Sequence, residues 1–202
     1  MINVLLYGDY SRVHWTLAQG LKKIGIHVKV ASNGDGFKNY PRDIDLNAKS
    51  KFGQLKVLVN QFLSTNYTGY DVVQLIGYCL YNKRYTISKK ITQHLKKTNK
   101  RLFLGAFGDD YYWISACMNR LFDYSFVGIN AGNEEIMNRE NIIENIINRH
   151  YSNSAFNLNQ YVAQKCDGII AGAYDYWLPY NHTIFNNKLE YIPLPINTEE
   201  LE

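Results

Sequence analysis

The sequence predicts an α/β protein with a doubly wound parallel sheet of the Rossmann-like kind, folded as a single domain. Two observations predict this fold. Short, nearly continuous apolar runs alternate along the chain with longer segments in which apolar residues recur every three or four positions. Such runs are typical of strands covered on both faces of a parallel sheet, and their alternation with amphipathic helices gives the doubly wound arrangement. The length of 202 residues suits one large domain.

The first predicted unit is a strand, a loop, a helix and a second strand. Residues 2–7 form an apolar run that the loop 8–12 interrupts. Apolar residues then recur every three or four positions over residues 13–24, as in an amphipathic helix, and Gly25 follows as a typical end signal. Residues 27–31 form the second strand. A helical crossover of this length requires the two strands to be parallel and the connection to be right-handed.

The same alternation continues to the end of the chain. The further predicted strands are residues 71–76, 101–105, 169–171 and 189–192. The further predicted helices are residues 54–63, 85–98, 134–149, 158–166 and 174–180. Residues 33–50 have the composition of a loop, and the aromatic-rich residues 111–130 fit no single period. The chain has no internal repeat and no low-complexity linker, which favours one domain.

The composition disfavours several classes of protein. A formal net charge of +4 is too small to predict nucleic-acid binding by itself. Three cysteines without a Cys-x-x-Cys pair indicate reduced, buried thiols in a cytoplasmic protein. No signal peptide is recognisable, and no run approaches the roughly 18 apolar residues of a spanning helix. The five histidines are scattered without ligand spacing, so we expect no metal site.

The loop after the first strand is the first candidate binding site, because ligands of open α/β sheets lie outside the carboxyl ends of the strands. It has neither Gly-x-Gly-x-x-Gly nor a P-loop pattern, and its acidic, bulky residues would repel a pyrophosphate. Its polar groups suit either hydrogen bonds to a polyol or capping of the following helix. The residues of this loop expected to bind substrate are Gly8, Asp9, Tyr10, Ser11, Arg12 and His14.

The loops after three later strands supply further candidates. In the loop 105–113, two glycines and four aromatic residues surround the adjacent carboxylates of Asp109 and Asp110. A carboxylate there suits a general base or a group that orients a sugar hydroxyl, and these two are the candidate catalytic residues. The alternative is that an aspartate caps the next helix. The further substrate-binding candidates are Gly77, Tyr78, Gly108, Tyr111 and Tyr174.

The segment 83–101 is strongly basic. It contains eight Lys or Arg and no acid, and five of its lysines gather opposite the apolar face of the predicted helix. A solvated outer face explains this pattern most simply. Contact with an anionic membrane surface is the sharper alternative. Nucleic acid is not expected as a partner, because no aromatic residues interleave the basic face.

Five segments, taken in order, carry a resemblance to a known family. Residues 17–28 resemble its first helix and second strand, and residues 70–77 resemble its Asp-Val-Val-x-x-x-Gly strand. Residues 108–110 resemble its Gly-Ser-Asp loop. Residues 165–171 and 191–197 resemble its closing strand pair and the Ile-Pro-Asn-Pro-Ile-Asp segment before its hinge. The chain in this way resembles the N-terminal, acceptor-side domain of GT-B glycosyltransferases, of the large retaining group that builds bacterial polysaccharides.

The resemblance implies that residues 1–197 form one half of a GT-B architecture, and that residues 198–202 begin the hinge or are a cloning remnant. The implied activity is transfer of a sugar from a nucleotide-sugar donor to a glycan or glycolipid acceptor. The donor would bind in a second, C-terminal domain on the same or a separate chain, with no cofactor in this domain. This domain alone would then be inactive, in the cytoplasm or at the inner face of the membrane.

The resemblance leaves the mechanism open. Asp110 would orient the acceptor in a retaining enzyme, whereas Asp110 or Asp109 would be the base in an inverting one. The first loop departs from the family, because Gly8 is followed by Asp9 where many members have a second glycine. The alternatives to a glycosyltransferase half are a stand-alone binding module of Rossmann-like or flavodoxin-like type and one subunit of a split glycosyltransferase.

Overall fold

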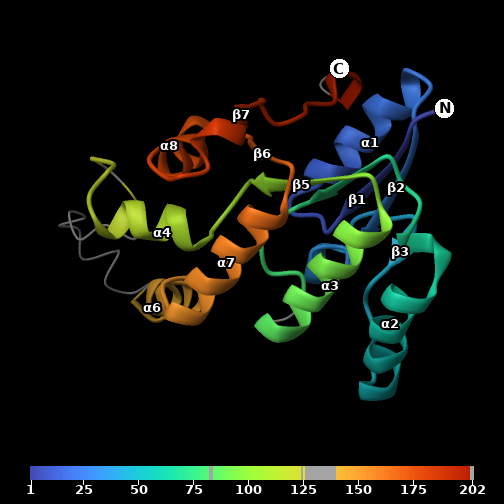
Figure 1. Cartoon of the computed structure of the whole chain (residues 1–202), viewed down its shortest axis with the longest axis horizontal. Helices are drawn as coiled ribbons and strands as arrows, with labels where there is room; N and C mark the ends of the chain where they lie inside the picture. The colour runs from blue at the N-terminus through green and yellow to red at the C-terminus, as the bar shows by residue number, and fades with distance from the viewer. Residues whose placement is uncertain (82–83, 124, 126–139, 201–202) are drawn as a thin grey trace.

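The computed structural model describes residues 1–81, 84–123, 125 and 140–200. Its strands form one sheet in the order β3-β2-β1-β4-β5-β6-β7, and neighbouring strands are parallel at every pairing. This confirms the predicted Rossmann-like α/β fold (Figure 1). The strands are β1 (Asn3–Tyr7), β2 (His27–Ser32), β3 (Ile44–Asp45), β4 (Val72–Leu75), β5 (Arg101–Ala106), β6 (Gly168–Ala171) and β7 (Leu189–Tyr191).

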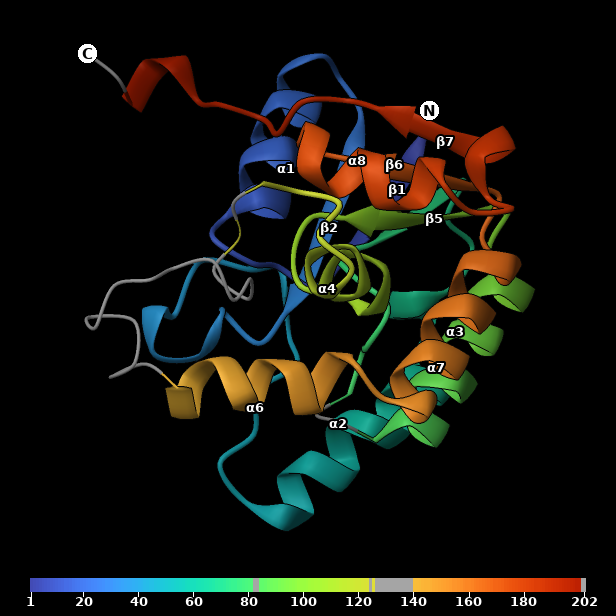
Figure 2. The same ribbon diagram turned by 90° about the vertical axis from the view of Figure 1, so that its left-hand side faces the viewer.

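Helices connect the strands and cover both faces of the sheet. They are α1 (Val13–Lys23), α2 (Lys51–Leu63), α3 (Tyr85–Thr98), α4 (Tyr111–Met118), α6 (Glu140–His150), α7 (Asn153–Lys165) and α8 (Tyr174–Asn181). Short 3-10 turns add η1 (Gly36–Lys38), η2 (Thr65–Tyr67), η3 (Asn186–Lys188) and η4 (Thr198–Glu200). Figure 2 shows α1 above the sheet, and α3, α7 and α6 below it. No helix among the described residues is long and apolar enough to cross a membrane.

The two faces of β1 show why this arrangement forms. Successive residues of a strand point to opposite faces, so a continuous apolar run supplies both cores. Val4 and Leu6 pack with Ala18 of α1 on one face. Leu5 belongs to the larger core on the other face, together with Leu95 of α3 and residues of α7. Full burial of a leucine side chain contributes roughly 1.5–3 kcal/mol, so a run buried on both faces fixes β1 at the centre of the sheet.

The strand order changes direction between β1 and β4. The chain runs outward from β1 to β2 and β3, and then returns to place β4 on the other side of β1. At such a point the loops on the two sides part and leave a crevice at the carboxyl ends of the strands. The ends of β1, β2 and β4 therefore define where a ligand should be sought.

Most predicted elements are confirmed, with element ends that differ by a few residues. Helix α2 begins at Lys51, earlier than predicted, because the Ser50 side chain accepts a hydrogen bond from the amide of Gly53. Helix α7 begins at Asn153, where Ser152 makes the same kind of cap. The predicted helix 134–149 is described only from residue 140 onward, so its first part lies outside the described residues.

Two elements were not predicted. Strand β3 has two residues, paired with the end of β2 inside the segment 33–50 that was interpreted as a loop. Two residues are too short to show an alternating pattern. Helix α4 lies in the segment left unassigned, because Trp113, Ile114 and Cys117 are all buried and leave no polar face to reveal a period. Near the other end of the chain, Glu199 lies 2.6 Å from Lys23 of α1, so η4 contacts the domain.

Candidate functional site

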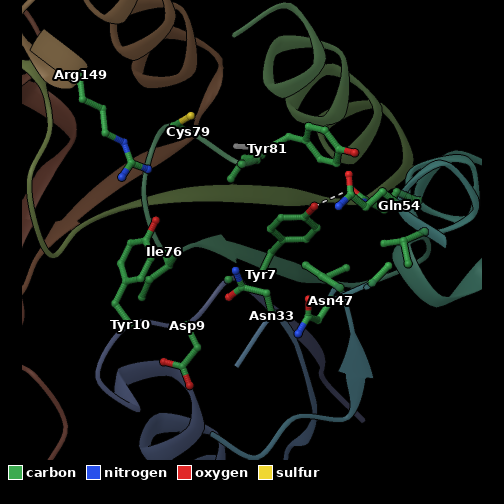
Figure 3. Close-up of a pocket in the computed structure, with 16 residues that line it drawn as sticks. Tyr7, Asp9, Tyr10, Asn33, Asn47, Gln54, Ile76, Cys79, Tyr81 and Arg149 are labelled. Carbon is green, nitrogen blue, oxygen red and sulfur yellow. Dashed lines mark hydrogen bonds between the residues drawn. The ribbon is translucent and has the colours of Figure 1, made fainter. Parts of the chain in front are cut away.

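A cavity of about 210 Å³ lies at the carboxyl ends of β1, β2 and β4, where the strand order changes direction (Figure 3). Its walls come from the loops after these strands, from one face of α2 and from the last turn of α6. Polar side chains dominate the lining. They are Tyr7, Asp9, Tyr10, Asn33, Asn47, Gln54, Gln61, Tyr81 and Arg149. A polar, concave site at this point of the fold is suited to a small hydrophilic ligand.

The α2 wall is tied to the sheet by one buried hydrogen bond. The Tyr7 hydroxyl, at the end of β1, donates to Oε1 of Gln61 at 2.5 Å. Both side chains are buried. Burial raises the pKa of Tyr7, so its hydroxyl stays neutral and remains a donor. An unpaired buried hydroxyl is costly, and this bond therefore fixes the position of α2 beside the cavity.

The first loop needs its glycine. Gly8 has φ of 83°, and a Cβ added to it would lie 2.3 Å from Cγ2 of Ile76. The next residue, Asp9, is buried, and its carboxylate accepts hydrogen bonds from the amides of His14 at 3.0 Å and Trp15 at 3.3 Å. Asp9 thus caps α1, which confirms the capping alternative, although it also lines the cavity. Burial raises the pKa of Asp9 to about 6, and the two hydrogen bonds oppose this change.

The other residues of the first loop shape its backbone turn and make hydrogen bonds that involve main-chain groups. Ser11 and Arg12 both have left-handed backbone conformations, with φ of 50° and 63°. The Ser11 amide donates to Oδ2 of Asp35 at 3.1 Å. Nδ1 of the buried His14 donates to the Gly8 carbonyl at 2.6 Å, and burial lowers the pKa of His14 to about 4. Of the six residues predicted in this loop, only Gly8, Asp9 and Tyr10 line the cavity.

A second, smaller cavity of about 20 Å³ adjoins the first and has room for about one water molecule. The two share Tyr10, Ile76, Cys79 and Arg149 in their lining. The small cavity joins the loops after β1, β4 and β5, so the structure does bring together candidates that are far apart in sequence. Those found there are Tyr10, Gly77, Tyr78, Gly108, Asp109 and Asp110.

Asp110 lies in a closed hydrogen-bond network. Its Oδ1 accepts from the amide of Trp113 at 2.9 Å, which caps α4, and its Oδ2 accepts from the Tyr180 hydroxyl at 2.6 Å. That hydroxyl in turn accepts from Asn159, whose Oδ1 accepts from the amide of Tyr111 at 3.0 Å. Burial raises the pKa of Asp110 to about 6. This confirms the capping alternative, and a catalytic role of Asp110 stays a prediction.

The remaining candidates divide between the small cavity and the surface. Asp109 is exposed, beside Arg149, and desolvation raises its pKa while the guanidinium opposes the change. The buried Tyr78 hydroxyl lies 2.9 Å from Nδ1 of His150 in a hydrogen bond.

Tyr174 is exposed and stacks on Trp177, with 5.6 Å between ring centroids, and does not line either cavity. Tyr111 packs against Tyr151 and Phe156 and also lies outside both cavities.

Arg149 is the residue that sequence reasoning missed. Its guanidinium points from the end of α6 toward Tyr10 and Cys79, where the two cavities meet (Figure 3). Within the part of the chain that the structure describes, no carboxylate forms an ion pair with it. Asn33, Asn47 and Gln54 were missed as well. Asn33 lies two residues after the end of a predicted strand, so the rule that located the other loops would have found it.

Comparison with known proteins gives a likeness of fold alone. No protein-family model and no curated protein matches the chain. Among solved structures, the chain is similar to the 3-alpha-hydroxysteroid dehydrogenase from Pseudomonas sp. B-0831 complexed with NADH, with 10% identity and a TM-score of 0.39. The match covers 84% of this chain and 70% of that chain. At this identity and score, the likeness is one of fold and says nothing of activity or ligand.

The expectation of a glycosyltransferase is wrong. No family model and no curated sequence supports a GT-B enzyme, and the solved structure reported above is a dehydrogenase by its own description. The segments that carried the resemblance are helices, strands and turns of a kind that any doubly wound sheet uses. Asp110 of the Gly108-Asp109-Asp110 loop caps helix α4. None of the comparisons supports sugar transfer.

Against the expectation that this domain takes no cofactor, the matched structure is itself a complex with NADH. The residues of this chain do not fit a dinucleotide in the usual place, however. A pyrophosphate there binds the free amides at the start of the first helix. In this chain those amides, of His14 and Trp15, already bind the buried carboxylate of Asp9, which would also repel a phosphate.

Proposed function

We propose that this chain is a Rossmann-like binding module for a small polar ligand that carries an anionic group. The observation that carries the proposal is the position of Arg149. Its guanidinium reaches the junction of two cavities at the change of strand order, and no described carboxylate forms an ion pair with it, although Asp109 lines the same small cavity. A guanidinium binds a carboxylate or phosphate with two parallel hydrogen bonds, which makes it suited to hold the charged end of a ligand.

The rest of the lining indicates the uncharged part of the ligand. Asn33, Asn47 and Gln54 each offer a donor and an acceptor in one side chain, which suits hydroxyl groups. The volume of about 210 Å³ lies below the roughly 300–1,000 Å³ of sites for drug-sized molecules. A hydroxylated metabolite with one phosphate or carboxylate has the required size and chemistry.

The charges of the cavity also orient such a ligand. Asp9 lines the cavity at the end of β1 and is mostly ionised at neutral pH, since its pKa is about 6. It repels an anionic group, whereas Arg149, which comes from α6, attracts one. The anionic end is therefore expected toward Arg149 and Cys79, and the hydroxylated part toward the amides of Asn33 and Asn47.

The test uses matched pairs of probes that differ only in charge. The full chain is titrated by calorimetry with inorganic phosphate, with a sugar phosphate and its parent sugar, with a hydroxy acid and its uncharged amide, and with NADH. We expect the charged member of a pair to bind at least about tenfold more tightly, as a charge-assisted hydrogen bond of roughly 1.5–3 kcal/mol implies.

The matched variants are Arg149→Gln, which removes the charge, and Arg120→Gln, which removes a charge from an exposed arginine outside both cavities. The first should lose the preference for the charged probe and the second should keep it. The proposal fails if no charged probe binds at millimolar concentration, or if the Arg149→Gln variant binds the charged probes as tightly as the native protein.

A further inference from the structure

Helix α2 carries an exposed apolar stripe on its outer face. Phe52, Leu55, Val59 and Leu63 are spaced by three, four and four residues, so they lie along one side of the helix. Their exposed fractions are 77%, 56%, 42% and 79%. Single exposed apolar residues are ordinary, but a continuous row of four indicates a surface that is covered in use.

The stripe does not serve the packing of the helix. Gln54, Val57 and Gln61 lie on the opposite side of α2 and line the cavity. Leu58 and Phe62 pack on the main core between these two sides, with the Phe62 ring 5.3 Å from that of His94. Figures 1 and 2 show α2 at the outer edge of the molecule, where nothing else in the described chain covers it.

The charge around the stripe selects the kind of partner. Residues 46–70 contain no Asp or Glu, and they carry three lysines, Lys49, Lys51 and Lys56, all exposed. Among the described residues, none of the three forms an ion pair. A second copy of the chain would set these like charges against one another. An anionic lipid surface offers both parts at once, negative headgroups for the lysines and acyl chains for the stripe.

Helix α3, which lies in the basic segment 83–101, is less well suited than α2 to contact an anionic lipid surface. Lys96 pairs with Asp167 and Lys100 pairs with Asp71, each at 2.6 Å, and Lys89 lies over the Tyr161 ring. Its apolar residues Ile91 and Leu95 are buried against the sheet. Its basic face therefore lacks an exposed apolar component and is partly neutralised by the protein itself.

We propose that α2 is a peripheral membrane-contact helix, which lies in the surface of an anionic phospholipid bilayer through Phe52, Leu55, Val59 and Leu63, with lysines on either side. This surface faces away from the ligand cavity and is independent of the ligand proposed above. Amphipathic helices of this kind bind by apolar burial and by attraction to anionic headgroups together. Both components must therefore be present for strong binding.

The test is co-sedimentation of the full chain with vesicles of phosphatidylcholine, alone or mixed with phosphatidylglycerol. Binding is expected to the mixed vesicles only. The double variant Phe52→Ser/Leu63→Ser should lose at least about tenfold in partitioning. Reversal of two charges, Lys51→Glu/Lys56→Glu, should lose about 25-fold or more, since each lysine near an anionic surface contributes about a fivefold gain.

Two controls locate the contact. Ile24→Ser/Phe37→Ser removes two equally exposed apolar residues elsewhere, and Lys90→Glu/Lys97→Glu reverses two charges on α3. Both should bind mixed vesicles like the native protein. Failure of the native protein to bind, or equal losses in either control, overturns the proposal. So does a native dimer in sedimentation velocity that Phe52→Ser/Leu63→Ser dissociates, because the stripe would then be a protein interface.

Discussion

Two polar clusters lie at the same edge of the sheet and differ in one respect. The cluster after β5 and β6 joins Asp110, Tyr180 and Asn159, and each of these hydrogen-bonds another. The cluster after β1 and β4 surrounds a cavity, and there Arg149 forms no ion pair with a described carboxylate. Buried polar groups that satisfy one another stabilise a fold, whereas a charge left facing a cavity is available to a ligand. The closed cluster should therefore matter for stability and the open one for binding.

The largest effect is expected from Asp110→Ala. The change removes the cap of α4 and leaves the buried Tyr180 hydroxyl without its acceptor. Loss of a cap costs about 1 kcal/mol, and an unsatisfied buried group about 1–3 kcal/mol more, so the free energy of unfolding should fall by about 3 kcal/mol in a urea titration. Asp109→Ala, at the exposed neighbour, is the control and should change it by less than about 0.5 kcal/mol. Similar losses in both variants would show that the network is not what stabilises this region.

The pH dependence of stability is expected to follow next. Asp110 has a pKa of about 6 in the fold and 3.8 as its ordinary value, so the folded state holds the proton where the unfolded state has lost it. Its contribution to stability is therefore greatest at about pH 4 and is lost as the pH rises through 6, by about 2–3 kcal/mol.

The matched comparison for this effect is Asp110→Asn, which keeps a capping oxygen and cannot ionise. The difference in unfolding free energy between native protein and variant should fall by that amount between pH 4 and pH 7. Asp9 and His14 titrate in the same range, but they are present in both proteins and cancel. If the difference in unfolding free energy between the two proteins is constant from pH 4 to pH 7, burial does not raise the pKa of Asp110 as described.

The smallest effect on stability is expected at the open cluster. Arg149→Gln should leave the free energy of unfolding within about 0.5 kcal/mol of the native value, because the exposed guanidinium forms no ion pair among the described residues. Thermal and urea unfolding of the two proteins would measure it. A loss above about 1 kcal/mol would place Arg149 with Asp110, as a residue that holds the fold.

The sheet was predictable because its central strands are buried on both faces and so appear as apolar runs. Strand β3 was not, since its two residues depend on pairing with β2. Helix α4 was not, since it is buried on several sides. In both cases the tertiary neighbours, rather than the local pattern, determine the structure.

The site was predictable only in part, for a related reason. The rule that ligands bind at strand ends located Asp9, Tyr10 and Asp109 correctly beside the cavities. Whether an aspartate at such a place caps a helix or faces a ligand depends on hydrogen-bond geometry that no spacing reveals. Arg149 reaches the cavity from α6, which lies more than a hundred residues further along the chain than the loop after β1. The short motifs that suggested a glycosyltransferase are common to the fold, and their order along the chain added no information about function.

Helix α2 takes part in both proposed sites, the ligand cavity and the membrane-contact surface, and this has a consequence for regulation. One side of this helix lines the ligand cavity with Gln54 and Gln61, and the other carries the stripe of Phe52 and Leu55. The Tyr7–Gln61 hydrogen bond joins the cavity side of the helix to the end of β1. Linkage is reciprocal: whatever factor a lipid surface adds to the affinity for the ligand, the ligand must add to the affinity for the surface. If the two sites are coupled through α2, occupancy of the cavity would therefore change how long the protein stays at a membrane.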